Sequence, residues 1–158
     1  MSPAVPTPQS PAERRAAEAE LKALLARIAP DHQRLAAAVR KFVQKRLPTS
    51  QELVYEYADS VVLSFTPNGQ GKDGVVAIRA SADEIRLYLS GKGLPDPQKL
   101  LNGAATTRWI VVEGASTLTQ PAVTALIEAA IARNKLPYPT TGIGSVVVRA
   151  TTASKRRG

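Results

Sequence analysis

The chain has 158 residues, of which 44% are apolar and 22% charged, as expected for one globular domain. It lacks cysteine and has a single histidine, His32, which excludes disulfides and metal sites built from thiolate and imidazole. The net charge of +8 lies toward both ends of the chain, because residues 51–100 are slightly acidic. Without a membrane-length apolar run or a secretory leader, the sequence predicts a cytoplasmic protein.

The first predicted helix follows a Pro- and Ser-rich segment, residues 1–10, which we expect to be disordered. Ser10 and Glu13 have the spacing of a capping box, with Pro11 at the first helical position. Pro30 should end this helix. Its apolar stripe consists of Leu21, Leu24, Leu25 and Ile28.

A second helix is predicted over residues 31–47, capped by Asp31 and stopped by Pro48. Its apolar stripe consists of Leu35, Val39, Phe42 and Val43. The basic side chains expected to face away from that stripe are Arg34, Arg40, Lys41 and Lys45. This arrangement predicts a positively charged helix surface.

The period then changes from helical to alternating, which predicts four strands. They cover residues 53–57, 60–66, 74–80 and 84–90, with a turn-rich loop between the second and third. Alternation places Ile85, Leu87 and Leu89 toward the core and Arg86 and Tyr88 on the opposite face. The four strands should form an antiparallel meander with one buried face.

The stretch from Gly91 to Gly103 contains turn residues followed by a predicted short helix, capped by Asp96 and ended by Gly103. A fifth strand over residues 108–113 and a third helix starting at Thr119 or Gln120 follow. A short sixth strand is possible over residues 145–151, before a basic tail at 152–158 that we expect to be disordered.

This order of elements is typical of an α+β fold. We expect a single domain over residues 11–151, with an antiparallel five- to six-stranded sheet and helices packed mainly on one face. The expected elements are two helices, a meander of strands, and then one strand and one helix. No segment of this series repeats, so nothing indicates a second unit.

A shallow pocket is predicted where the strand ends meet the Gly91–Gly103 stretch. The polar and amphipathic residues expected there are Tyr57, Asp59, Arg86, Tyr88, Lys92 and Arg108. Arginine and tyrosine in one cleft can bind a small anionic or planar ligand. The alternative is that Tyr88 and Trp109 simply cover the outer face of the sheet and the charges keep it solvated.

A second hypothesis is binding of nucleic acid or another polyanion through the basic helix 31–47 and the C-terminal tail. The residues that would contact phosphates are Arg34, Arg40, Lys41, Lys45 and Arg46. A solvated helix face would carry the same charges, and no aromatic residues are interleaved with them.

Enzymatic activity is not predicted, because no catalytic constellation is evident. The glycines around Lys72 and Ile143 lack the spacing of nucleotide-binding loops. A general base at Glu56 or Asp59 is the remaining enzymatic hypothesis. We expect no cofactor and no metal, and the sequence leaves the oligomeric state open.

The run Gly91-Lys92-Gly93-Leu94-Pro95-Asp96-Pro97, with Leu100-Leu101-Asn102-Gly103, resembles the YdhG-like domain family (domain of unknown function eighteen-oh-one). The resemblance covers roughly residues 20–150 and implies a compact α+β domain with an antiparallel sheet. It also implies an iron-chaperone hypothesis, because some members carry that label by likeness to frataxin. The Tyr-Gly-Met-Pro motif of many members is absent here, since Ala58 follows Tyr57. The resemblance therefore assigns iron to no named residue.

Together these observations predict a small binding or accessory protein without catalysis. The polyanion-associating module is the alternative, and the iron chaperone is a third hypothesis.

Overall fold

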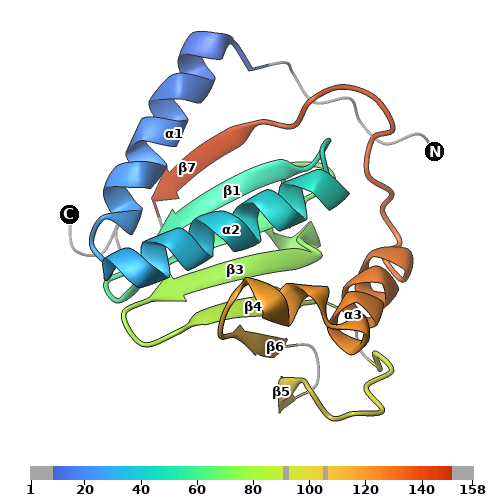
Figure 1. The fold of residues 1–158 in the computed structure, drawn as a ribbon. Helices are drawn as coiled ribbons and strands as arrows, with labels where there is room; N and C mark the ends of the chain where they lie inside the picture. The colour runs from blue at the N-terminus through green and yellow to red at the C-terminus, as the bar shows by residue number, and fades with distance from the viewer. Residues whose placement is uncertain (1–8, 91–92, 105–106, 151–158) are drawn as a thin grey trace.

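The computed structural model of the chain describes residues 9–90, 93–104 and 107–150. Within these residues, three α-helices lie on one face of a single twisted sheet (Figure 1). The α+β prediction is confirmed. The predicted five- to six-stranded antiparallel sheet is only partly right, because the sheet has seven strands and is mixed.

The three helices are α1 (Pro11–Leu25), α2 (Pro30–Arg46) and α3 (Pro121–Ala132). Each begins with proline, whose fixed φ suits the first helical turn. The predicted capping box is present, since the Ser10 hydroxyl accepts from the Glu13 amide at 3.0 Å and Glu13 accepts from the Ser10 amide. The prediction that Asp31 caps α2 is wrong, because Ala29 holds that position and Asp31 lies inside the first turn.

The strands are β1 (Gln51–Glu56), β2 (Ser60–Thr66), β3 (Val76–Ser81), β4 (Ile85–Leu89), β5 (Asn102–Ala104), β6 (Thr107–Val112) and β7 (Val146–Ala150). They are arranged in the order β5-β6-β4-β3-β2-β1-β7. All neighbouring pairs are antiparallel except β1 and β7, which are parallel. After α3 the chain thus returns to the edge of the sheet far from β6 (Figure 1).

The core lies between the helices and one face of the sheet. Alternation along β2, β3 and β4 points every second side chain into it, as the sequence predicts. Phe65 and Ile78 are fully buried there, packed in one cluster with Val39 from α2 and Ile127 from α3. The opposite face of the sheet carries no α-helix of the described chain, and this face positions the candidate site (Figure 1).

The short helix predicted after Asp96 does not form. The Asp96 carboxylate instead accepts from the amides of Leu100 and Leu101, at 2.8 and 2.9 Å, and closes a turn. Lys99 adopts a positive φ of 54°, which interrupts any right-handed helix at that position. The chain then enters β5, and Gly103, expected to end a helix, lies within that strand.

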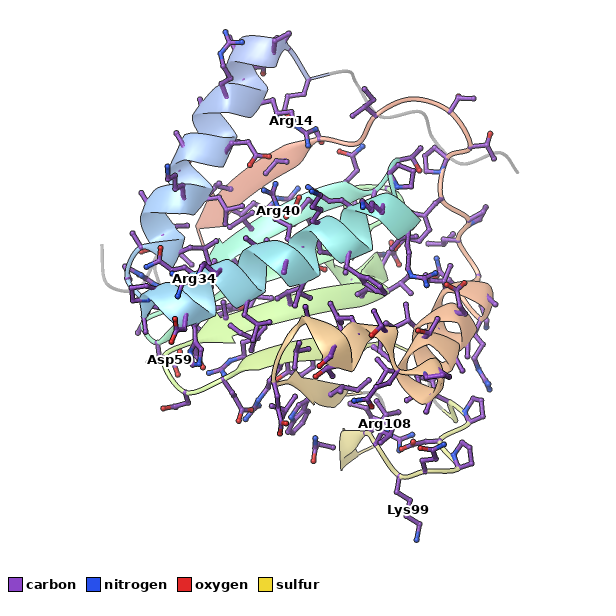
Figure 2. The ribbon with its side chains drawn as sticks, in the orientation of Figure 1. Arg14, Arg34, Arg40, Asp59, Lys99 and Arg108 are labelled. Atoms are coloured by element: carbon purple, nitrogen blue, oxygen red, sulfur yellow. The ribbon has the colours of Figure 1, made fainter. Side chains whose placement is uncertain are left out.

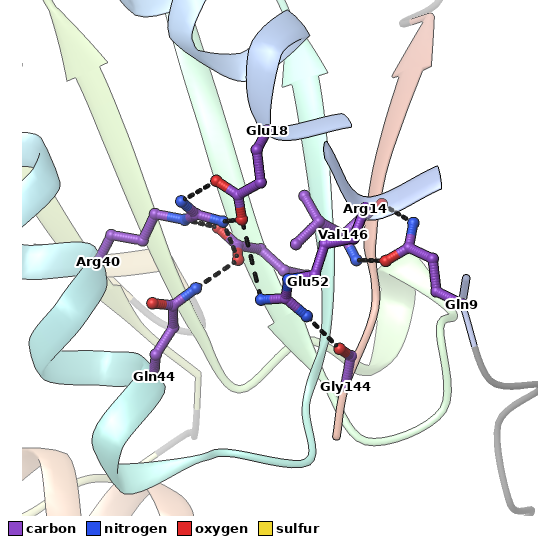
Figure 3. A network of polar contacts seen from close by, with 8 residues as sticks. All are labelled: Gln9, Arg14, Glu18, Arg40, Gln44, Glu52, Gly144 and Val146. Carbon is purple, nitrogen blue, oxygen red and sulfur yellow. Dashed lines mark hydrogen bonds and ion pairs between the residues drawn. The ribbon is translucent and has the colours of Figure 1, made fainter. Parts of the chain in front are cut away.

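A polar network holds α1 against the β7 edge of the sheet (Figure 3). Arg40 of α2 lies between Glu18 of α1 and Glu52 of β1, with nitrogen-to-oxygen distances of 2.7 Å to each carboxylate. Arg14 donates to the carbonyl of Gly144 at 2.7 Å. The consecutive elements α1, α2 and β1 and the segment that leads into β7 are therefore joined by charge-assisted hydrogen bonds.

The segments predicted to be disordered lie almost entirely outside the described residues, which exclude 1–8 and 151–158. Ser10, which caps α1, and Gln9 are the exceptions. The side-chain amide of Gln9 donates to the carbonyl of Val146 at 2.8 Å and accepts from the amide of the same residue at 3.0 Å. The side chain of Gln9 therefore bonds the outer edge of β7 as the backbone of a neighbouring strand would.

Candidate functional site

A groove of about 520 Å³ lies on the face of the sheet opposite the helices. We call it the open-face groove. Its floor consists of the outward-facing side chains of the central strands, among them Val62 and Ser64 of β2 and Ala77 and Arg79 of β3. These floor side chains are mostly small, so they leave space above the sheet. The volume is in the range of ligand-binding pockets.

The loop between β2 and β3 forms one wall of the groove. Gly71 and Gly74 line it, and a Cβ at Gly74 would meet the hydroxyl oxygen of Ser64. The loop is therefore packed tightly on the sheet at this position, and glycine permits that close approach. Asn68 and Asp73 brace the loop through a side-chain hydrogen bond of 2.9 Å. The wall is thus an ordered part of the fold.

Arg79 supplies the positive charge of the groove. Its guanidinium donates to the Asp59 carboxylate at 3.3 Å, while the Asp59 side chain remains 77% exposed at the β1–β2 turn. Directly opposite Arg79, on β4, is Arg86. The two guanidinium groups turn apart, because Arg79 reaches toward the β1–β2 turn while the partners of Arg86 lie on or beside β4 and on β6. Each arginine has a carboxylate partner, but Asp59 is the more exposed of the two carboxylates, so Arg79 is the more available for an added anion.

Arg86 belongs to a cluster of planar groups beside the groove, which we call the arginine–aromatic cluster (Arg86, Tyr88 and Trp109). The Arg86 guanidinium lies 4.5 Å from the centroid of the Trp109 ring and donates to the Tyr88 hydroxyl at 3.1 Å. The Tyr88 and Trp109 rings are 5.5 Å apart. Hydrogen bonding to Glu84, foremost, raises the pKa of Arg86, so its charge is fixed.

The structure brings together only part of the predicted pocket. Tyr57, Asp59 and Tyr88 line the groove, and Arg86 lies next to it. Arg108 does not, because its side chain lies on the helix side of the sheet, 3.8 Å from Asp96, far from Asp59 in Figure 2. Lys92 lies outside the described residues.

Arg79 is not among the residues predicted for the pocket, although the sequence contains a signal for it. Val76, Ile78 and Ala80 alternate as inward-facing residues, so Arg79 must face outward, as the same argument predicts for Arg86. The short turn between β3 and β4 then sets the two arginines opposite one another. Ser64 and Gly74 could not be found in this way, because their place in the groove depends on how the long loop folds back.

The predicted polyanion surface of α2 is mostly occupied by ion pairs. Arg40 was expected to face away from the core, and this is wrong, because its side chain is 15% exposed and held by two carboxylates. Arg34 pairs with Asp31, and Arg46 pairs with Glu128. Lys41 and Lys45 are exposed and form no ion pair with any residue that the structure describes.

The groove offers binding groups but few reactive ones. Its ionisable lining groups are Tyr57, Asp59, Arg79 and Tyr88. In the described part of the chain, no three His, Asp or Glu side chains are grouped so that they could hold a metal ion. None of the helices described is long and apolar enough to cross a membrane.

Comparison of the chain with protein-family models, curated proteins and solved structures finds no match. The YdhG-like resemblance therefore stays a prediction, as do the activity, partners and compartment inferred from the sequence.

Proposed function

We propose that this protein binds a small anionic ligand with a flat or apolar body in the open-face groove, without catalysing a reaction. The observation that carries the proposal is the position of Arg79, on the groove floor and directly opposite Arg86. The anion would lie against the Arg79 guanidinium, while the body of the ligand would lie over the small side chains of β2 and β3.

The energetics favour an added anion at this position. Asp59 is the ion-pair partner of Arg79, but it is highly exposed and sits on a turn, so the pair contributes at most about 1 kcal/mol. An incoming phosphate or carboxylate can displace Asp59 toward solvent at small cost. Phosphate can take two hydrogen bonds from one guanidinium, which adds geometric selectivity.

Phenyl phosphate is a suitable probe, because it joins a flat ring to an anion. At about one hundred times its Kd, a ligand that binds only the folded state adds about 2.7 kcal/mol of stability. For a domain of this size we expect the melting temperature to rise by about 5 °C or more.

Arg79→Gln should abolish this rise, and Lys41→Gln is the matched control. The control removes the same charge from the helix side of the molecule and should leave the rise unchanged. Equal losses in the two variants would mean that net charge alone attracts the probe, and the proposal would then be wrong.

A further inference from the structure

The arginine–aromatic cluster extends the open-face groove toward the edge of the sheet. Tyr88 belongs to both, since it lines the groove and lies 5.5 Å from Trp109. All three cluster side chains are partly exposed. The groove and the cluster therefore form one continuous surface, with the Arg79 guanidinium at one side and the planar groups of the cluster at the other.

The contacts within this cluster order its planar groups before any ligand arrives. Arg86 is fixed by Glu84 through its Nε atom, by the Tyr88 hydroxyl through Nη1, and by the face of Trp109. A guanidinium held in this way has little rotamer freedom left to lose on binding, which favours affinity. Ordered arginine and aromatic planes are the groups on which nucleobases stack.

The spacing of the two parts suits one nucleotide. Arg79 and Arg86 are opposite on adjacent strands, and Tyr88 follows Arg86 two residues later on the same face. Cβ atoms at such positions lie within about 5–8 Å of one another. A phosphate on Arg79 would thus leave an attached ring within reach of Tyr88, which lines the same groove, and of Trp109 beside it.

We propose that the ligand of the open-face groove is a nucleotide unit, with its phosphate on Arg79 and its base stacked on the arginine–aromatic cluster. This inference rests on the proposed function and specifies its ligand class. The unit can come from a free mononucleotide or from a single-stranded nucleic acid. The net charge of +8 favours association with either.

Trp109 is the only tryptophan of the chain, so its fluorescence reports on stacking at this position alone. The experiment titrates the full chain with adenosine 5′-monophosphate and, in parallel, with ribose 5-phosphate, which carries the phosphate without a base. We expect the nucleotide to quench Trp109 saturably and to bind about tenfold more tightly than the sugar phosphate, since stacking one base is worth about 1–3 kcal/mol.

Two variants separate this inference from the proposed function. Arg86→Lys keeps the charge but removes the planar group, so it should weaken nucleotide binding about tenfold and change ribose 5-phosphate binding less than twofold. Arg79→Gln should weaken both ligands. If the nucleotide and the sugar phosphate bind equally and Arg86→Lys affects neither, the nucleotide assignment is wrong while anion binding at Arg79 stands. If Arg79→Gln also affects neither ligand, both proposals fail.

A third titration, with a single-stranded oligonucleotide of about ten adenylates, distinguishes the two sources. Binding that is tighter than that of the mononucleotide and falls steeply with salt supports a single strand as the natural ligand. Equal or weaker binding of the oligonucleotide, with the mononucleotide still quenching Trp109, supports a free nucleotide. Failure of both to quench Trp109 overturns the inference.

Discussion

Arg40 illustrates how one residue can join three elements. Its guanidinium contacts Glu18 and Glu52, and Gln44 donates to the same Glu52 carboxylate at 3.2 Å (Figure 3). The Glu52 side chain is only 3% exposed, so its charge depends on Arg40 for compensation. A buried pair of this kind contributes little in total, yet removing one member leaves the other charge unpaired.

We therefore expect Arg40→Met to lower the free energy of unfolding by about 3 kcal/mol, because Glu52 is left buried and uncompensated. Lys41→Met on the same helix is the control and should stay within about 0.5 kcal/mol of the parent. Adding Glu52→Gln to Arg40→Met should recover part of the loss. Urea denaturation measures the free energy of unfolding of each variant. An Arg40→Met variant as stable as the control would show that Glu52 does not depend on Arg40 for charge compensation.

Gly144 is a second residue on which the fold depends. A Cβ built at this position would overlap the carbonyl group of Ser50, and the backbone of Gly144 also bonds Pro48 and Arg14. The strand that follows cannot move away freely, because β7 is paired along its length with β1.

Gly144→Ala should therefore cost about 1–3 kcal/mol of stability through overpacking. Gly142→Ala tests the neighbouring glycine, where a Cβ meets nothing but φ is +94°, so its cost should come from backbone strain alone, about 1–2 kcal/mol. Thermal melting of both variants, with NMR of the β1–β7 amides, checks the distinction. Only Gly144→Ala should shift the β1 resonances.

At the scale of elements, α1 depends on polar contacts with the edge of the sheet. Hydrogen bonding from Arg40, foremost, lowers the pKa of Glu18 below its ordinary value of 4.5. A carboxyl with a lowered pKa in the folded state stabilises the fold above its unfolded pKa, and this contribution is lost as the pH falls through the folded value.

Glu18→Gln should thus destabilise the protein by about 1 kcal/mol at pH 7, since the pair is partly exposed. The difference between parent and variant should shrink as the pH falls below 4.5, the ordinary pKa, and through the lower pKa of Glu18 in the folded protein. Melting temperatures of the parent and the variant across the acid range measure this difference. A difference that is constant with pH would show that the Glu18 charge is not what holds α1.

Sequence reasoning was accurate where structure depends on neighbours along the chain. The Ser10 capping box, the apolar stripes of the helices and the alternation of β2 to β4 all follow from local spacing. The pairing of β7 with β1 could not be predicted, because it joins segments about 90 residues apart and no local spacing specifies the partner strand. The helix expected after Asp96 does not form, because the Asp96 side chain accepts hydrogen bonds from the amides of Leu100 and Leu101 and closes a turn. Local capping rules do not distinguish such a turn from the start of a helix.

In the candidate site, too, residues set by local spacing could be predicted and residues set by tertiary contacts could not. Tyr57, Asp59, Arg86 and Tyr88 could be found as strand-end and outward-facing residues. Arg108 was grouped with them wrongly, because its position on the helix side depends on the register of β6 with β4. Arg40 was predicted to be an exposed cation, but it pairs with the buried carboxylate of Glu52 in β1. Charge alone, without tertiary contacts, does not say which arginines are free to bind.

At the scale of the whole molecule, the helices and the open face of the sheet have separate roles in this account. The helix side buries the core and uses most of its arginines in internal ion pairs. The open face carries the groove, the opposed arginines and the arginine–aromatic cluster. Because the two faces are separate, residues of the open face can change without disturbing the core. We therefore expect a bound anion to change the environment of residues on the open face alone.

An NMR titration of the uniformly ¹⁵N-labelled protein with phenyl phosphate shows whether an anion binds on the open face. We expect saturable shift changes at the amides of Ser64, Ala77, Arg79 and Tyr88, and none at Lys41 and Lys45 on α2. Shift changes confined to α2, or spread evenly over all exposed lysines and arginines, would contradict this expectation.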